Sequence, residues 1–81
     1  MVRVEKLLRK AKQQPNSLQF SELRTLVSLL GFELDRQKGS HLVYVHPRVR
    51  DPLVISSHSG KAVAYQVRRV VSLAEEHNLL E

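Results

Sequence analysis

The residues of this sequence best suited to chemistry are two histidines, each close to a lysine and to a small polar turn. His41 lies three positions after Lys38, and His58 lies three positions before Lys61. The polar residues that precede them are Gly39 and Ser40 in the first case and Ser56 and Ser57 in the second. Imidazole is the only side chain whose unperturbed pKa, about 6.5, lets it exchange protons near neutrality. The pattern therefore indicates proton transfer beside a positive charge.

RNA cleavage is a reaction that such a site could perform without a metal ion. A base removes the proton of the 2′-hydroxyl group, the oxygen attacks the adjacent phosphate, and an acid protonates the leaving oxygen. One imidazole contributes about 10²–10⁴-fold to such a reaction, and a cation such as Lys38 stabilises charge that develops on the phosphate. The sequence does not separate acid from base. The alternative that His41 is a turn-proximal residue without chemistry also stays open at this point.

The other two histidines, His46 and His77, are predicted to be structural or surface residues. A zinc site made of His41, His46 and His58 is disfavoured, since a single H-x₄-H spacing is weak evidence without thiolate or carboxylate ligands. Positions 41 and 46 would also face opposite sides of a strand. No segment resembles the nucleophile elbow of a serine hydrolase. We therefore expect no metal and no small-molecule cofactor.

Composition favours one basic domain over residues 1–81. Its 81 residues include no cysteine, which excludes disulfides and thiolate metal sites, and the net charge is +5. A small basic protein commonly binds a polyanion, and nucleic acid is the first candidate. The longest apolar runs are far too short to span a membrane. The charged segment Met1–Leu8 does not resemble a secretory signal, so we expect a cytoplasmic protein.

Three segments have the apolar spacing of helices. Residues 3–13 place Val4, Leu7, Leu8 and Ala11 on one stripe, and their other face is basic. Residues 21–30 repeat this spacing, with Ser21 as the expected N-cap and Gly31 as the expected residue after the helix. The last helix covers roughly residues 65–77, with a stripe of valines and Ala74.

Between the second and third helices the apolar period changes to two, which is typical of strands. We expect strands at 32–36, 41–46 and 53–56, a hairpin connection at 37–40, a loop at 47–52 and a polar turn at 57–61. In the second strand, Leu42 and Tyr44 share one face and His41 lies on the other. The predicted order is α-α-β-β-β-α. This is an α+β two-layer sandwich with a three-stranded antiparallel sheet and helices on one face.

Taken together, these segments resemble the HicA toxins of the HicA–HicB toxin–antitoxin family. The resemblance covers most of residues 18–77 and includes two signatures. The residues of the first are Phe20-Ser21-Glu22-Leu23, Gly31-Phe32 and Gly39-Ser40-His41; those of the second are His58-Ser59-Gly60-Lys61 and Tyr65-Gln66-Val67-Arg68. The combined string is much more specific than any single motif.

The resemblance implies a fold similar to double-stranded-RNA-binding domains and the activity of an mRNA interferase, a small endoribonuclease restrained by a HicB antitoxin. It implies that His41 is the catalytic histidine and Gly39 its supporting glycine. We predict that RNA phosphate contacts come from Lys38, Gly39, Ser40, His58, Lys61 and Arg68. Residues 3–13 resemble an extension present in only some members, whose basic face either binds RNA or is simply solvated.

Some positions depart from the family pattern, and rival functions remain. Leu42, Ser57 and Ala64 stand where many members carry a second histidine and two prolines. The main alternative is a non-catalytic RNA-binding module, in which arginines contact phosphates. These arginines would be Arg48, Arg50, Arg68 and Arg69. A third reading is an inhibitor-binding fold that has lost its activity.

Overall fold

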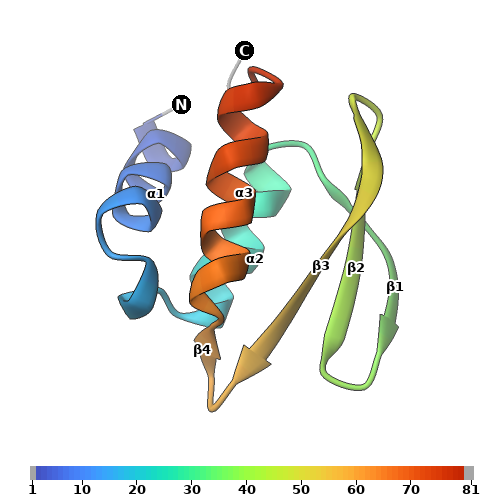
Figure 1. The fold of residues 1–81 in the computed structure, drawn as a ribbon, viewed down its shortest axis with the longest axis horizontal. Coiled ribbons are helices and arrows are strands. Elements are labelled where there is room, and N and C mark those ends of the chain that lie inside the picture. Colours follow the sequence, from blue (N-terminus) through green and yellow to red (C-terminus); the bar gives the residue numbers. More distant parts are fainter. Residues whose placement is uncertain (1, 80–81) are drawn as a thin grey trace.

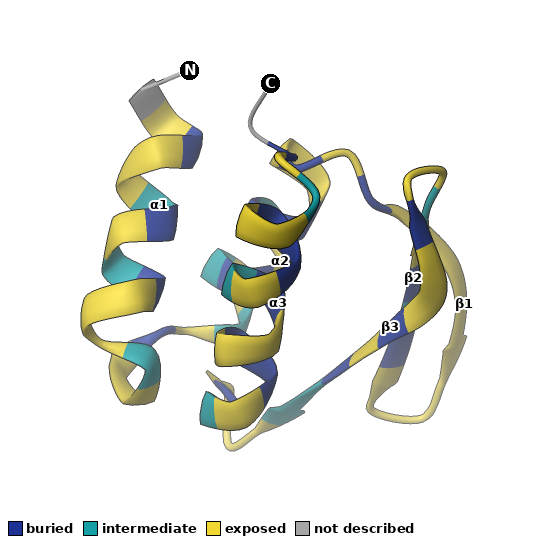
Figure 2. Cartoon of the chain, turned by 45° about the horizontal axis from the view of Figure 1, so that its top comes forward, coloured by how far each residue is buried: buried dark blue, intermediate teal, exposed yellow. Residues whose placement is uncertain are grey.

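The computed structural model describes the backbone of residues 2–79 and contains three α-helices, one short 3₁₀ helix and four strands (Figure 1). In chain order these are α1 (Val2–Gln13), η1 (Pro15–Ser17), α2 (Phe20–Leu29), β1 (Glu33–Lys38), β2 (His41–His46), β3 (Val49–His58), β4 (Lys61–Ala62) and α3 (Ala64–Glu76). The helices lie on one side of the sheet (Figure 2). The predicted α+β class is confirmed, and all three predicted helices are present.

The sheet has four strands in the order β1-β2-β3-β4, so the prediction of three strands is wrong. The residues expected to form a loop at 47–52 mostly belong to β3, and only Pro47 and Arg48 form the turn before it. Pro52 lies near an irregularity between β2 and β3, where the register shifts between Tyr44 and His46. A proline is tolerated at such a bulge because its missing N–H breaks no regular ladder hydrogen bond.

Strand β4 was also missed: Lys61 was assigned to the polar turn, and Ala62 was assigned to no element. It pairs with the end of β3 and contacts the segment before α2 on its other side. The Phe20 N–H donates to the Gly60 carbonyl over 3.1 Å, and the Ala62 N–H donates to the Leu18 carbonyl over 3.0 Å. Backbone hydrogen bonds from distant segments therefore create a strand that has no local sequence signal.

Helix α2 begins one residue earlier than predicted, and Ser21 is not its N-cap. Gln19 occupies that position in a capping box: its side chain accepts from the backbone N–H of Glu22, and the Glu22 carboxylate accepts from the Gln19 N–H over 2.9 Å. This reciprocal arrangement satisfies two N–H groups that have no partner within the helix. Ser21 lies in the first turn instead, and its carbonyl accepts from the Thr25 hydroxyl.

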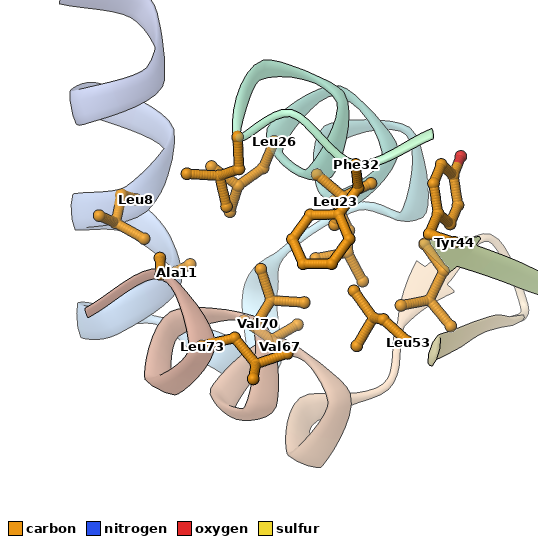
Figure 3. Packing of buried hydrophobic residues seen from close by; sticks show 14 of the residues in the cluster. Leu8, Ala11, Leu23, Leu26, Phe32, Tyr44, Leu53, Val67, Val70 and Leu73 are labelled. Atoms are coloured by element: carbon orange, nitrogen blue, oxygen red, sulfur yellow. The ribbon is translucent and has the colours of Figure 1, made fainter. Parts of the chain in front are cut away.

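Apolar side chains from the helices meet the inner face of the sheet in one core. Leu42 and Tyr44 of β2 and Leu53 and Ile55 of β3 are buried, which confirms the predicted alternation of faces. They pack against α2 and α3, and Val4, Leu8 and Ala11 attach α1 to the same cluster. The labelled members are shown in Figure 3. Full burial of one such aliphatic side chain stabilises a fold by about 1.5–3 kcal/mol.

Gly31, which directly follows α2, lies close to His46. Its φ is +101°, and a Cβ built there would lie 2.9 Å from His46 Nε2. That nitrogen lies 3.1 Å from the Leu30 carbonyl, while Nδ1 accepts from the Arg48 N–H over 3.0 Å. Because a backbone N–H can only donate, Nε2 carries the proton and donates to Leu30. His46 is thus a structural residue, as predicted.

We expect Gly31→Ala to destabilise the fold by about 2–3 kcal/mol, since it combines backbone strain with overlap against His46. Gly60→Ala is the matched control. Gly60 also has a positive φ, +79°, but a Cβ there meets nothing within 4 Å. Gly60→Ala is therefore expected to lower the free energy of unfolding by about 1 kcal/mol. Urea unfolding measures both. Equal losses in the two variants would contradict the contact with His46.

A second prediction concerns Glu22, whose pKa is lowered from the ordinary value of 4.5 by hydrogen bonds from Lys10 and from the Gln19 N–H. A group with a lowered pKa in the folded state stabilises the fold above its unfolded pKa and loses that contribution as the pH falls. The stability advantage over Glu22→Gln is therefore present above pH 4.5 and shrinks below it. Urea midpoints at about pH 7 and about pH 3 test this.

The control for this prediction is Glu33→Gln. The Glu33 carboxylate is exposed and makes no ion pair within the described residues. The urea midpoint of the Glu22 variant, relative to the parent, should change with pH more strongly than the relative midpoint of the control. A difference at Glu22 that stays constant with pH would contradict the ionic interaction.

Candidate active site

The first candidate hairpin joins β1 to β2 and is closed by Lys38 and His41. These two residues are register partners, and directly opposite side chains in an antiparallel pair have Cβ atoms about 4.5–5.5 Å apart. The loop consists of Gly39, with a φ of +60°, and Ser40, whose φ is not positive. A positive φ at only the first loop residue is the pattern of a type II′ turn, which favours glycine there. The turn thus holds the lysine beside the imidazole.

The second candidate hairpin joins β3 to β4 and repeats this pairing in reverse. His58 is the register partner of Lys61. Both loop residues have positive φ, 53° for Ser59 and 79° for Gly60, which is the pattern of a type I′ turn. Each hairpin therefore carries one histidine directly opposite one lysine, and all four side chains are exposed.

Strand β3 connects the two hairpins, since Ser56 is the register partner of His41 and His58 follows two residues later. Side chains two residues apart on a strand share a face. The two hairpins lie at the same end of the molecule, joined by β3 (Figure 1).

The side chain of Gln66 fixes β3 beside the candidate site. Gln66 is a buried polar residue, only 6% exposed, in the first turn of α3. Its Oε1 accepts from the Ser56 N–H over 2.8 Å, and its Nε2 donates to Ser56 Oγ over 3.2 Å. Gln66 has no predicted role of its own from the sequence. The available signal was its place beside Val67 on the apolar stripe, where a buried amide needs a partner.

The His41 side chain makes no hydrogen bond or ion pair within residues 3–79. His58 and Lys61 border a concavity that is also lined by Ser56, Ser57, Ser59 and the start of α3. Helix α3 follows Val63, which offers no capping side chain. The site therefore offers two exposed imidazoles, two ammonium groups and hydroxyl groups on a surface that is open to a large substrate.

Other predicted residues lie away from these hairpins. Arg68 is exposed on α3 and borders a hollow together with Lys12 and Pro15. Arg48 donates to the His77 carbonyl at the end of α3. The described residues contain no group of three or more metal-ligating side chains. They also include no helix long and apolar enough to cross a membrane.

Comparison with known proteins identifies the family. The model of the family described as HicA toxin of bacterial toxin-antitoxin systems matches residues 20–75. Neither the curated proteins nor the solved structures yield a match. The matched span contains both hairpins and ends within α3, and it leaves α1 outside. Because the match covers well over half of the sequence, this chain belongs to the HicA toxin family, whose members are the toxins of toxin–antitoxin systems.

Proposed function

We propose that this toxin is a metal-independent endoribonuclease that cleaves mRNA, with His41 as a general acid or base. The observation that carries the proposal is the exposed His41 imidazole directly opposite Lys38 at the end of the β1–β2 hairpin. The net charge of +5 supports it, since a basic protein attracts a polyanion. The arrangement α2-β1-β2-β3-α3 further supports a fold like that of double-stranded-RNA-binding domains, extended by α1 and the short β4.

In the proposed reaction the RNA supplies its own nucleophile. The 2′-oxygen loses its proton and forms a bond to the adjacent phosphorus, while the bond from phosphorus to the 5′-oxygen breaks. The leaving 5′-oxygen takes up a proton, so the products are a 2′,3′-cyclic phosphate and a 5′-hydroxyl group. His41 transfers one of these two protons, and the Lys38 ammonium stabilises the extra charge on the phosphate oxygens.

The remaining site residues bind the RNA backbone in this proposal. His58 and Lys61 hold a phosphate at the second hairpin, and the small residues Gly39 and Ser40 let the RNA approach the first. Arg68, on α3, contacts only RNA that extends beyond the two hairpins. Such contacts fix the position of the substrate without reading its sequence.

The proposed partner is a HicB-like antitoxin that covers His41 and so keeps the toxin inactive. HicA family toxins pair with an antitoxin, and an exposed catalytic side chain on a small surface is easily blocked by a bound protein. Both the mRNA substrate and the antitoxin would be met in the cytoplasm. Expression of the toxin alone should arrest growth, and co-expression of its antitoxin should relieve the arrest.

His41→Ala is expected to slow RNA cleavage by at least about 10²-fold, because it removes a proton-transfer group. The variant should keep its unfolding midpoint and its affinity for RNA, since the His41 side chain is exposed and contributes nothing to the core. Cleavage is followed on a labelled RNA with a chelator present. His77→Ala, at the other end of α3, is the control and should cleave normally.

Two results would count against this proposal. A His41→Ala protein that cleaves RNA as fast as the parent would falsify the role of the imidazole. A parent protein that binds RNA but leaves it intact would favour the alternative of a non-catalytic RNA-binding module.

His58→Asn and Lys61→Gln are expected to raise KM several-fold while kcat stays within about threefold of the parent value, because each removes a phosphate contact rather than a proton transfer. Lys38→Gln should instead lower kcat, since its charge acts on the transition state. Steady-state kinetics on one RNA separates the two effects. A kcat for His58→Asn as low as that of His41→Ala would show that His58 transfers a proton and would contradict its assignment to binding alone.

A further inference from the structure

Helix α1 lies before the residues that match the family, and the structure divides its basic residues into two groups. Lys10 and Lys12 attach the helix: Lys10 Nζ lies 2.8 Å from the Glu22 carboxylate, and Lys12 Nζ lies 2.6 Å from that of Glu75. The others are Arg3, Lys6 and Arg9, which are exposed and have no carboxylate within 4.0 Å among the described residues. Their charge is available to a ligand.

Two of these unpaired residues border a groove between α1 and α2. One hollow is lined by Arg3, Lys6, Leu7, Lys10, Ser21, Glu22 and Thr25. A neighbouring hollow is lined by Arg3, Ser21, Arg24, Thr25, Ser28, Leu29 and Tyr44. Because the two hollows share Arg3, Ser21 and Thr25, they adjoin each other, and together we call them the groove.

The groove is positively charged. Arg3, Lys6 and Arg24 lie along it without an ion-pair partner in the described part of the chain, and its one carboxylate, Glu22, is neutralised by Lys10. The exposed hydroxyl of Ser28 adds a hydrogen-bond donor. Cations and hydroxyl groups along an open groove suit the phosphate backbone of a nucleic acid.

The far end of the groove lies on the strand that carries the candidate catalytic residue. Tyr44 is three residues from His41 on β2, which corresponds to about 10 Å at the usual rise of a strand. Because Tyr44 faces the core side of β2 and His41 faces away from it, an RNA strand that occupies the groove reaches His41 only by passing around the edge of the sheet.

We propose that α1 and α2 form a second RNA-binding site, which holds the phosphodiester backbone of the substrate beyond the cleavage point through Arg3, Lys6 and Arg24. This inference rests on the proposed function, because it takes RNA as the ligand. Its consequence is that α1 increases affinity for RNA without taking part in the chemical step. Deleting α1 cannot test it, since Val4, Leu8 and Ala11 belong to the core.

The test compares the double variant Arg3→Gln/Lys6→Gln with Arg9→Gln/Lys12→Gln, which loses the same charge from exposed residues of α1 outside the groove. The probe is a 2′-O-methyl oligouridylate, which lacks the attacking hydroxyl group and stays intact. Its affinity is measured by fluorescence anisotropy over a range of salt concentrations. Each lost contact lowers the salt-dependence slope by about 0.7 for a single strand, so the groove variant should lose about 1.4 and bind several-fold more weakly.

The control variant should keep both its slope and its affinity close to those of the parent. Equal effects in the two variants, or a parent that does not bind the probe, would overturn the proposal. Cleavage of unmodified RNA by the groove variant should show a raised KM and an unchanged kcat. Cleavage by His41→Ala tests the proposed chemistry separately, because the binding assay does not depend on any reaction.

Discussion

The candidate site depends on the register of β3, which pairs with β2 up to Ser56 and with β4 from Ser57 onward. This change of partner makes β3 the link between the two hairpins, which lie at the same end of the molecule (Figure 1). Because strand side chains alternate, a slip by one residue would move His58 to the other face. The Ser56 hydrogen bonds to Gln66 and the burial of Ile55 oppose such a slip.

His46 and His41 lie on the same strand, but their surroundings differ. Both ring nitrogens of His46 are hydrogen-bonded to backbone groups, and its ring packs edge-on against Phe32 with centroids 5.0 Å apart. His41 is on the same strand but faces away from the core and has no such partner within the described residues. An exposed imidazole costs the fold nothing, so a reactive group can stand there without weakening the structure. The helices and the inner face of the sheet supply the stability instead.

Much of this arrangement could be predicted from the sequence, since it arises from local pattern. The helical stripes, the alternation in β2 and the Gly39-Ser40 turn each depend on residues close together in the chain. The missed features depend on distant partners. Strand β4 exists because Ala62 bonds to Leu18, and β3 extends through Pro52 because a register shift accommodates it. The buried role of Gln66 became visible only when α3 was placed against β3.

The same distinction applies to the basic residues of α1. In the sequence they form a single charged run, and a run of this kind is usually a solvated helix face. In the fold, two of the lysines are used to attach the helix, and Glu22 combines the cap of α2 with the anchor of α1. That attachment positions Arg3 and Lys6 along a groove shared with α2. Fixed cations lose less freedom on binding than cations on a mobile extension, so they hold a phosphate backbone more effectively. The packing of α1 therefore fixes where its unpaired cations lie on the surface, which the sequence alone does not show.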